Sequence, residues 1–423
     1  MILFSRGSAG AVLSPQEVRE ALFASLDRIG KKKRVIAVPP DYTRYHSQAG
    51  LLTEMVWDYY GKALTDVLPA IGSHFPMNDE EIGTMFGKVP RDLFRVHDWR
   101  DGVATLGEVP AALVKEVSEG KVDYSIPIQV DKLLASGSHD LILSIGQVVP
   151  HEVIGMAGYN KNIFVGTGGA EGINKTHFLG AVFGMERMMG HADSPVRKIF
   201  DYGSGKFAGH LPIMYVLTVV GKDDQGKLAI KGLFIGDDAE CFYRAATLSV
   251  EVNLQLLNAP IGKAIVYLDP MEFKSTWLGN KSIYRTRMAL ADGGEIIVLA
   301  PGLSRFGEDD RIDGLIRKYG YTGTPNILEL VRTQEDLRQN LGTAAHLIHG
   351  SSEGRFTITY CPGQLTKREV EGVNFRYADL HAMTARYNPE RLTEGFNTLE
   401  NGEEVFFISN PALGLWACRE RFE

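Results

Sequence analysis

His139-Asp-Leu-Ile-Leu-Ser-Ile-Gly146 is a continuous apolar run that ends at a glycine, and it predicts a buried strand of a parallel sheet. Three chemically capable side chains, His151, Lys161 and His177, follow it at gaps of ten and sixteen residues. Ligands of open α/β sheets bind outside the carboxyl ends of the strands. The run and the segment behind it therefore indicate an α/β fold and a candidate site.

Upstream, polar loops follow two more predicted strands. A capped amphipathic helix is expected from Ser14, and the strand 34–38 leads into Asp41-Tyr-Thr-Arg44. After a helix over 50–64, the strand 68–71 leads into Gly72-Ser-His74. Carboxyl ends of parallel strands share one edge of a sheet. Four of these side chains are expected near a single crevice: Asp41, Arg44, His74 and His151.

Downstream, the segments 209–220 and 228–236 read as two paired strands, and 237–257 reads as a long helix. The pattern then restarts near residue 258. A second βαβ unit is predicted from strands 263–268 and 294–300 around the mostly helical stretch 273–291, with later strands at 355–360 and 404–408.

With 423 residues and 44% hydrophobic content, the chain is too long for one ordinary core. We expect two α/β domains with mainly parallel sheets and an active site in the interdomain cleft. The predicted domains are 1–257 and 258–397, and 398–423 could rejoin the first of them.

Composition narrows the class of protein further. A net charge of −7, with the one basic run Lys31-Lys-Lys-Arg34 placed before a strand, argues against a nucleic-acid partner. Three widely spaced cysteines fit neither a disulfide framework nor a Cys-x-x-Cys metal site. No stretch resembles a signal peptide or a transmembrane helix, so we expect a cytoplasmic protein without a membrane partner.

Each candidate also has an ordinary interpretation. Asp41 and Arg44 could cap a helix and form a surface ion pair, and His74 could be a half-buried loop histidine. His151 could begin a helix, and Lys161 could face solvent. The remaining candidate, His177, could be a core histidine, and it has no second histidine at metal-ligand spacing.

The glycines near Lys161 do not identify a common nucleotide motif. Gly166-Thr-Gly-Gly169 departs from the triphosphate-binding loop and is weak support for a dinucleotide site. The missing Gly-x-Gly-x-x-Gly after an early strand also weighs against an NAD-dependent hydroxyacid dehydrogenase, which is one possible function of an α/β protein with these loops. Another is a catalytically inactive protein that binds a carboxylate or a metal.

Taken together, the loops resemble the nickel-pincer cofactor-dependent lactate racemase family of 2-hydroxyacid racemases and epimerases. Asp41-x-Thr-Arg44 is similar to the family's Asp-His-Thr-Arg loop, with Tyr42 in place of the histidine. Gly72-Ser-His74-Phe-Pro-Met is similar to its Gly-Thr/Phe-His-Arg-Pro segment. The most specific part is the spacing of His151, Lys161 and His177, which matches the family's catalytic histidine, cofactor-bearing lysine and nickel-binding histidine.

The resemblance implies an isomerase whose cofactor-binding catalytic domain is 1–257. Lys161 would carry the nickel-pincer nucleotide, a pyridinium mononucleotide with two sulfur-containing arms, as a covalent thioamide, and His177 would be the nickel ligand from the protein. His74 and His151 would exchange the hydroxyl proton while hydride leaves and returns at Cα of the 2-hydroxyacid. Asp41, Thr43 and Arg44 would hold the cofactor, and Arg44 would also bind the substrate.

In the second domain the resemblance implies substrate contacts at Trp277, Leu278 and Lys281. Trp277 falls where the family has a tyrosine, and Leu278 falls where lactate racemase has a glutamine. Leucine cannot donate a hydrogen bond, which favours a 2-hydroxyacid other than lactate. The expected partners are this small acid and the enzymes that synthesise the cofactor.

Overall fold

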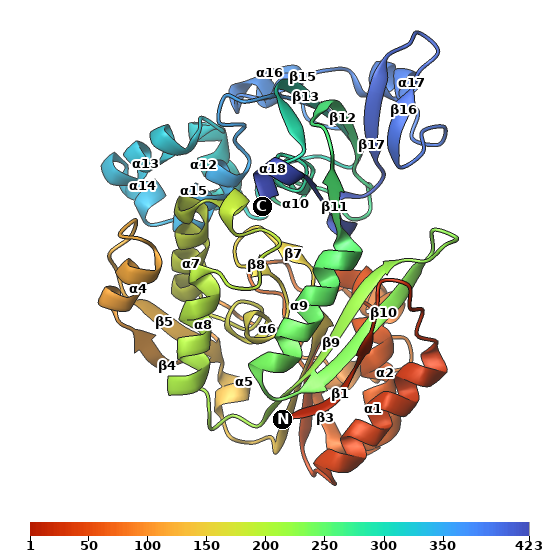
Figure 1. Cartoon of the computed structure of the whole chain (residues 1–423). Coiled ribbons are helices and arrows are strands. Elements are labelled where there is room, and N and C mark those ends of the chain that lie inside the picture. The colour runs from red at the N-terminus through yellow and green to blue at the C-terminus, as the bar shows by residue number, and fades with distance from the viewer. Residues whose placement is uncertain (423) are drawn as a thin grey trace. The chain divides into compact units, whose positions relative to one another are not determined.

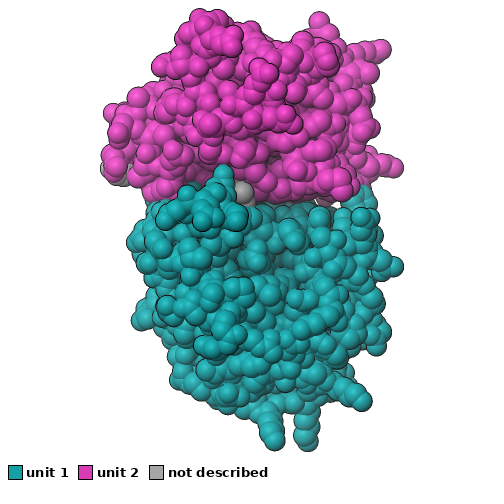
Figure 2. All heavy atoms as spheres, turned by 90° about the vertical axis from the view of Figure 1, so that its right-hand side faces the viewer, with its two compact units in different colours: residues 1–179, 188–253 teal, residues 180–187, 254–423 magenta. Residues whose placement is uncertain are grey.

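The computed structural model describes residues 1–422 and divides into two compact units, coloured separately in Figure 2. The first comprises residues 1–179 and 188–253, and the second comprises 180–187 and 254–423. The division at 253/254 lies close to the predicted restart near 258, but assignment of 180–187 to the second unit was not predicted. Within the described residues, no helix has the length and apolar character needed to cross a bilayer.

The first unit is built on a six-stranded sheet in the order β1-β10-β9-β6-β2-β3, of which Figure 1 labels β1, β10, β9 and β3. From β9 to β3 neighbouring strands run parallel, while β1, β10 and β9 pair antiparallel. Its strands are β1 (Ile2–Gly7), β2 (Val35–Val38), β3 (Leu64–Val67), β6 (Leu141–Gln147), β9 (Ile213–Lys222) and β10 (Leu228–Gly236). The predicted strand pair 209–220 and 228–236 is thus confirmed as β9 and β10.

Helix α1 (Pro15–Ile29) begins where the sequence predicted, because Ser14 and Glu17 form a reciprocal capping box. Val18, Leu22 and Leu26 of α1 are fully buried in a core that also contains the apolar face of α2 (Ala49–Tyr60). The strand predicted at 68–71 lies instead at β3, because the helix before it ends at Tyr60 and Gly61 takes a positive φ.

Smaller elements complete the first unit. Two two-stranded sheets are formed by β4 (Val103–Val109) with β5 (Ile126–Asp131) and by β7 (Pro150–His151) with β8 (Gly155–Met156). The remaining α-helices in or entering this unit are α3 (Asp79–Phe86), α4 (Ala111–Val117), α5 (Lys132–Ala135), α6 (Asn160–Phe164), α7 (Ala170–Phe183), α8 (Pro195–Lys206) and α9 (Ala239–Asn253). The 3-10 turns are η1 (Tyr42–Ser47), η2 (Gly61–Ala63) and η3 (Arg91–Leu93).

The second unit has a six-stranded sheet in the order β15-β14-β13-β12-β17-β16, parallel except for the last pair. Its strands are β12 (Ile261–Tyr267), β13 (Leu290–Ala300), β14 (Thr357–Pro362), β15 (Arg376–Tyr377), β16 (Gly395–Thr398) and β17 (Glu404–Ile408). The expectation that 398–423 could rejoin the first domain was wrong, because β17 pairs along β12 inside this sheet.

Two helix predictions at the start of the second unit also differ from the structure. The long helix over 237–257 ends at Asn253, and β11 (Leu254–Leu257) pairs in parallel with β18 (Leu415–Cys418). The stretch 273–291 contains only the one-turn helices α10 (Thr276–Gly279) and α11 (Lys281–Tyr284) before β13 begins. Pairing of β11 with the distant β18 accounts for the first difference.

The remaining helices of the second unit are short. They are α12 (Asp310–Tyr319), α13 (Thr324–Thr333), α14 (Glu335–Arg338), α15 (Leu341–His349), α16 (Lys367–Gly372), α17 (Leu380–Arg386) and α18 (Arg419–Phe422), with 3-10 turns η4 (Met185–Arg187) and η5 (Pro411–Leu413). Residues 180–187 are fixed here through Glu186, whose Oε1 accepts from Arg287 Nε at 2.6 Å and from Arg355 Nη1 at 3.0 Å. Arg287 is buried, so this carboxylate neutralises a desolvated cation.

Candidate active site

The carboxyl ends of β2 and β3 bring the Asp41 and His74 loops together. The parallel ladder continues past the two strands as a bridge between Pro40 and Ala70. Beyond it, His74 Nδ1 lies 2.6 Å from Asp41 Oδ2, and Thr43 Oγ1 donates to Asp41 Oδ1 at 2.6 Å. Both carboxylate oxygens are therefore engaged, which fixes the orientation of the imidazole.

Asp41 is an ionised carboxylate in this arrangement. Burial alone would raise its pKa, but the neighbouring His74, Thr43 and Arg44 together hold the pKa below its usual value. The exposed fraction of the Asp41 side chain is 5%, against 29% for His74. A buried anion thus supports a histidine that remains accessible.

Lys161 lies on α6, which is attached to the same edge of the sheet. The side chain of the next residue, Asn162, donates to Val38 O at the end of β2 (2.9 Å) and to Ser144 Oγ on β6 (3.1 Å). The loop after α6 meets the His74 loop through a hydrogen bond from Gly72 N to Gly166 O (2.8 Å). A Cβ on Gly166 would come within 2.6 Å of Ala70, so glycine is required for this close approach.

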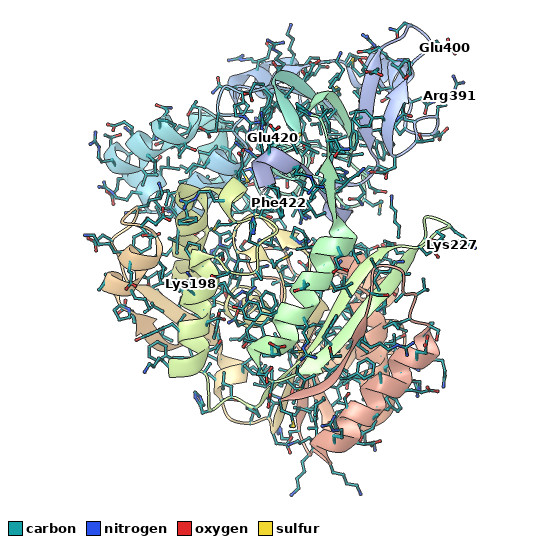
Figure 3. All side chains as sticks on the ribbon, viewed as in Figure 1. Lys198, Lys227, Arg391, Glu400, Glu420 and Phe422 are labelled. Atoms are coloured by element: carbon teal, nitrogen blue, oxygen red, sulfur yellow. The ribbon has the colours of Figure 1, made fainter. Side chains whose placement is uncertain are left out.

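The amine of Lys161 is much easier to deprotonate than that of an ordinary lysine. Lysines such as Lys198 and Lys227 project into solvent (Figure 3), whereas Lys161 is half-buried. Its pKa is lowered to about 8, mainly by the loss of surrounding water and secondly by the nearby Arg44 cation. Arg44 of η1 therefore lies within electrostatic range of the Lys161 amine.

His177 lies on α7, one helix after Lys161. Its Nδ1 atom lies 2.7 Å from Ile173 O and donates to it, which leaves the Nε2 lone pair for another partner. Burial, followed by the charge of Lys161, lowers the pKa of His177 to about 4. The imidazole is therefore neutral at pH 7, which is the form that binds metals.

His151 forms part of the short β7–β8 hairpin that follows β6 in the chain, and it is buried. Its Nδ1 accepts from Val153 N at 3.2 Å, and Glu152 Oε2 lies 3.7 Å from the same nitrogen. The charge of Glu152 raises the pKa values of both Lys161 and His177 against the larger effects of burial, so this hairpin lies within electrostatic reach of both.

Two buried clusters that the sequence did not reveal hold the Lys161 segment. On one side the buried Arg197 donates to Asn160 Oδ1 and to Met156 O (2.8 Å), while Asn160 Nδ2 donates to Asp201 (2.7 Å). This cluster accompanies a positive φ of 57° at Tyr159, a conformation that non-glycine residues rarely adopt. The one signal in the sequence for this supporting role was that Tyr159 and Asn160 directly precede the candidate Lys161.

On the other side, His97 reaches the glycine loop between α6 and α7. Its Nδ1 lies 2.7 Å from Asp131 Oδ2 and its Nε2 lies 3.0 Å from Gly168 O. Ala170 N donates to Trp99 O at 2.9 Å, so residues 97–99 hold both ends of this loop turn. The distance in sequence between these partners concealed the cluster.

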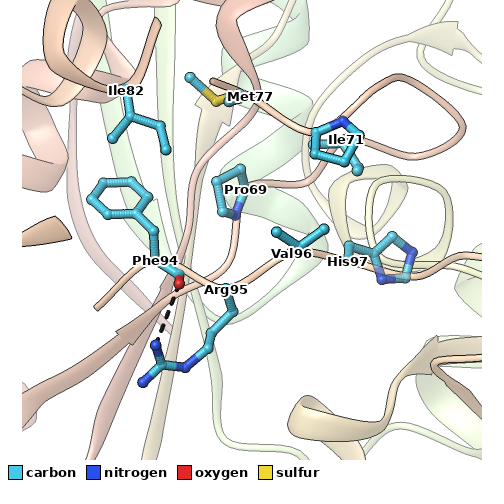
Figure 4. Close-up of a pocket in the computed structure, with 9 residues that line it drawn as sticks. Pro69, Ile71, Met77, Ile82, Phe94, Arg95, Val96 and His97 are labelled. Carbon is cyan, nitrogen blue, oxygen red and sulfur yellow. Dashed lines mark hydrogen bonds between the residues drawn. The ribbon is translucent and has the colours of Figure 1, made fainter. Parts of the chain in front are cut away.

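A small pocket beside the His74 loop is not large enough to be the substrate site (Figure 4). Its volume of about 30 Å³ has room for a water molecule but not for an organic acid. The lining is mostly apolar, with Ile71, Met77, Phe94 and Val96 in the wall. The two basic residues in the wall, Arg95 and His97, contact Asp66 and Asp131.

The structure places the three remaining predicted residues in the second unit. The rings of Trp277 and His346 pack in a tilted arrangement with centroids 4.6 Å apart, and both Trp277 and Leu278 are partly exposed. Lys281 is 3% exposed, and its Nζ lies 4.0 Å from Glu272 Oε1. Their contacts with a substrate stay predictions.

Comparison with known families identifies the N-terminal part of the chain. Residues 16–189 match the family model of the lactate racemase N-terminal domain. This range contains Asp41, His74 and the His151, Lys161 and His177 series. No curated protein sequence matches the chain.

Two solved structures have the same fold over nearly the whole chain. A Thermotoga maritima protein is 23% identical with a TM-score of 0.83, covering 98% of this chain and 100% of its own. The lactate racemase apoprotein of Thermoanaerobacterium thermosaccharolyticum is 17% identical with a TM-score of 0.67, covering 98% of this chain and 94% of its own. At these identities the likeness shows the fold alone.

The sheets define a mixed α/β protein, and its fold is similar to that of the lactate racemase apoprotein. Residues 16–189 match the lactate racemase N-terminal domain, so the resemblance inferred from the loops is confirmed over this part of the chain.

Proposed function

We propose that the chain is an isomerase that racemises or epimerises a 2-hydroxyacid. The observation that carries this proposal is the convergence of an Asp41-supported His74 with the weakly basic amine of Lys161 and the neutral imidazole of His177. A proton-transfer group, an amine able to react near neutral pH and a metal-binding nitrogen are the groups that the family's reaction requires.

The residues fit a nickel-pincer nucleotide. Lys161 would bear it covalently, since an amine with a pKa of about 8 is partly neutral at pH 7 and able to form the thioamide bond. His177 would bind nickel through Nε2. Within residues 1–422 no three His, Cys, Asp or Glu side chains form a metal-binding group, which fits a metal whose other donors belong to the nucleotide. When bound, the group supplies reversible hydride acceptance from Cα of the acid.

Arg44 suits the anionic part of a ligand at this place. Its Nη1 atom is buried and makes no hydrogen bond with residues 1–422, which is costly for a cation unless a ligand completes the site. A guanidinium offers a planar fork to a phosphate or a carboxylate. With Asp41 and Thr43, this residue would bind the nucleotide, the acid or both.

His74 and His151 would move the hydroxyl proton. In His74, Nδ1 faces Asp41, which leaves Nε2 to take up or return the proton. In His151, Nδ1 accepts from the Val153 amide, so exchange would also occur at Nε2. In either direction, one imidazole starts neutral and takes the proton from the substrate hydroxyl while the other starts protonated and gives its proton to the product.

The second unit would contact the acid through Lys281, Trp277 and Leu278. An ammonium group can bind the substrate carboxylate. Leu278 cannot donate to a polar substituent, so we propose a 2-hydroxyacid other than lactate.

Intact-mass analysis tests this proposal. Protein produced together with the cofactor-synthesis enzymes should gain a nickel-containing adduct at Lys161, and Lys161→Ala should not. A panel of single-enantiomer 2-hydroxyacids, followed by chiral product analysis, then identifies the substrate. Net consumption of NAD would indicate a dehydrogenase instead, and an adduct-free protein without racemisation would contradict the proposal.

A further inference from the structure

Gln147, the last residue of β6, has a buried side-chain oxygen without a partner. Its residue exposure is 7%, and its Oε1 atom makes no hydrogen bond within the described residues. A buried amide oxygen left unpaired costs about 1–3 kcal/mol. Native proteins rarely keep such groups unless a ligand, water or ion completes them.

The sheet register places this side chain beneath η1. Gln147 pairs with Thr218 on β9, and in parallel strands paired residues project from the same face. The Thr218 hydroxyl donates at 2.9 Å to the carbonyl of Ser47, the last residue of η1. Leu143 and Ile145 on the same strand lie in the core shared with α2, and the odd-numbered residues of β6 therefore face this side.

η1 also carries Arg44, whose Nη1 is a second buried atom without a hydrogen-bond partner among the described residues. Arg44 N donates to Asp41 O at 3.0 Å in the loop that follows β2, the parallel neighbour of β6, and its charge acts on both Asp41 and Lys161. An unsatisfied donor on η1 and an unsatisfied acceptor on the strand end beneath it are complementary to an anionic ligand that also bears a hydroxyl group.

We propose that Gln147 is a further ligand-binding residue, which accepts a hydrogen bond from a hydroxyl group of the ligand that Arg44 holds by its anionic group. This inference rests on the proposed function. The shared chemistry is a hydroxyl next to an anion, which occurs both in a ribose phosphate and in a free 2-hydroxyacid.

The inference is tested on the full-length cofactor-free protein by calorimetry with four probes. One pair is nicotinic acid mononucleotide and its 2′-deoxyribose analogue, and the other is 2-hydroxybutyrate and butyrate, which lacks the hydroxyl. Gln147→Met should weaken binding of the hydroxylated member of one pair about ten-fold or more and leave its deoxy counterpart unchanged. The affected pair identifies the source of the hydroxyl.

Thermal unfolding separates this role from a structural one. Gln147→Met and Gln147→Leu remove an unpaired amide, so the melting temperature of the cofactor-free protein should stay equal or rise. A lower melting temperature, together with equally weakened binding of both members of a pair, would overturn the inference. If Arg44→Met abolishes binding while Gln147→Met changes nothing, the Gln147 inference fails and the proposed function stands. If no probe binds the native protein, the Gln147 inference fails, and the proposed function is decided by the intact-mass and chiral-product measurements.

Discussion

His74 Nδ1 and Asp41 Oδ2 lie 2.6 Å apart, although 33 residues separate them in the chain. The contact exists because β2 and β3 are parallel neighbours whose carboxyl ends meet. A carboxylate at Nδ1 orients the ring and stabilises the protonated imidazole.

Replacing Asp41 should therefore lower the rate of proton transfer more than the stability of the fold. For Asp41→Asn in the cofactor-loaded enzyme, we expect kcat to fall about 100-fold or more, within the usual range for general acid–base catalysis. Steady-state kinetics with chiral product analysis measure it. The matched control is Asp66→Asn, which breaks a similar pair with His139 (2.8 Å) away from the site and should lower stability while the folded enzyme keeps its kcat. Equal effects of the two changes on kcat would contradict a special role for Asp41.

Lys161 should react with amine reagents at unusually low pH. Because burial and Arg44 lower its pKa to about 8, acylation of the cofactor-free protein by a small anhydride should rise with a midpoint near pH 8. Peptide mass spectrometry across pH follows the modification. Lys115 provides the internal control, since its ion pair with Asp123 raises its pKa above the ordinary value. A Lys161 profile that coincides with that of Lys115 would show that the amine is not perturbed.

His177 should make the cofactor-free protein sensitive to mild acid. Its pKa is about 4 in the folded chain and about 6.5 in the unfolded chain, so between these values the unfolded state binds more protons. This group's contribution makes stability rise with pH across that window, by at most about 1.4 kcal/mol per pH unit. In urea titrations at several pH values, His177→Gln should show a correspondingly weaker dependence. An unchanged slope would mean that His177 titrates normally.

His97 should hold the loop between the Lys161 and His177 helices. Both of its nitrogens face acceptors, and removing one partner of a buried pair typically costs about 3–5 kcal/mol. We expect His97→Ala to lower the free energy of unfolding by that order and to accelerate hydrogen exchange at the Ala170 amide. Exchange at Ala264 and Val266, in the sheet of the second unit, is the reference. Fast exchange at all three would indicate global unfolding instead.

Local sequence patterns predicted several strands of the two main sheets and the loops that follow them, although the strand expected at 68–71 lies at 64–67. The apolar run 139–146 became β6, Glu404–Ile408 was predicted with its observed bounds, and the spacing of His151, Lys161 and His177 indicated a family whose N-terminal domain the chain contains. These features depend on local periodicity and turn residues, which sequence records directly.

What the sequence concealed depends on contacts between distant residues. The end of α9 at Asn253 follows from pairing of β11 with β18, about 160 residues later. The Arg197 and His97 clusters and the unpaired oxygen of Gln147 are equally invisible to a local pattern, because each is defined by partners from other elements or by the absence of one. Burial of a polar group becomes informative only when its surroundings are known.

Glu186 has a consequence for synthesis of the chain. The segment 180–187 emerges from the ribosome well before Arg287 and Arg355, the two cations that it neutralises. The segment 180–187 must therefore stay available until the rest of the second unit has been synthesised. A fragment limited to 254–423 would bury Arg287 without its carboxylate, so we expect this half to be poorly stable when expressed by itself unless residues 180–187 are supplied as a peptide.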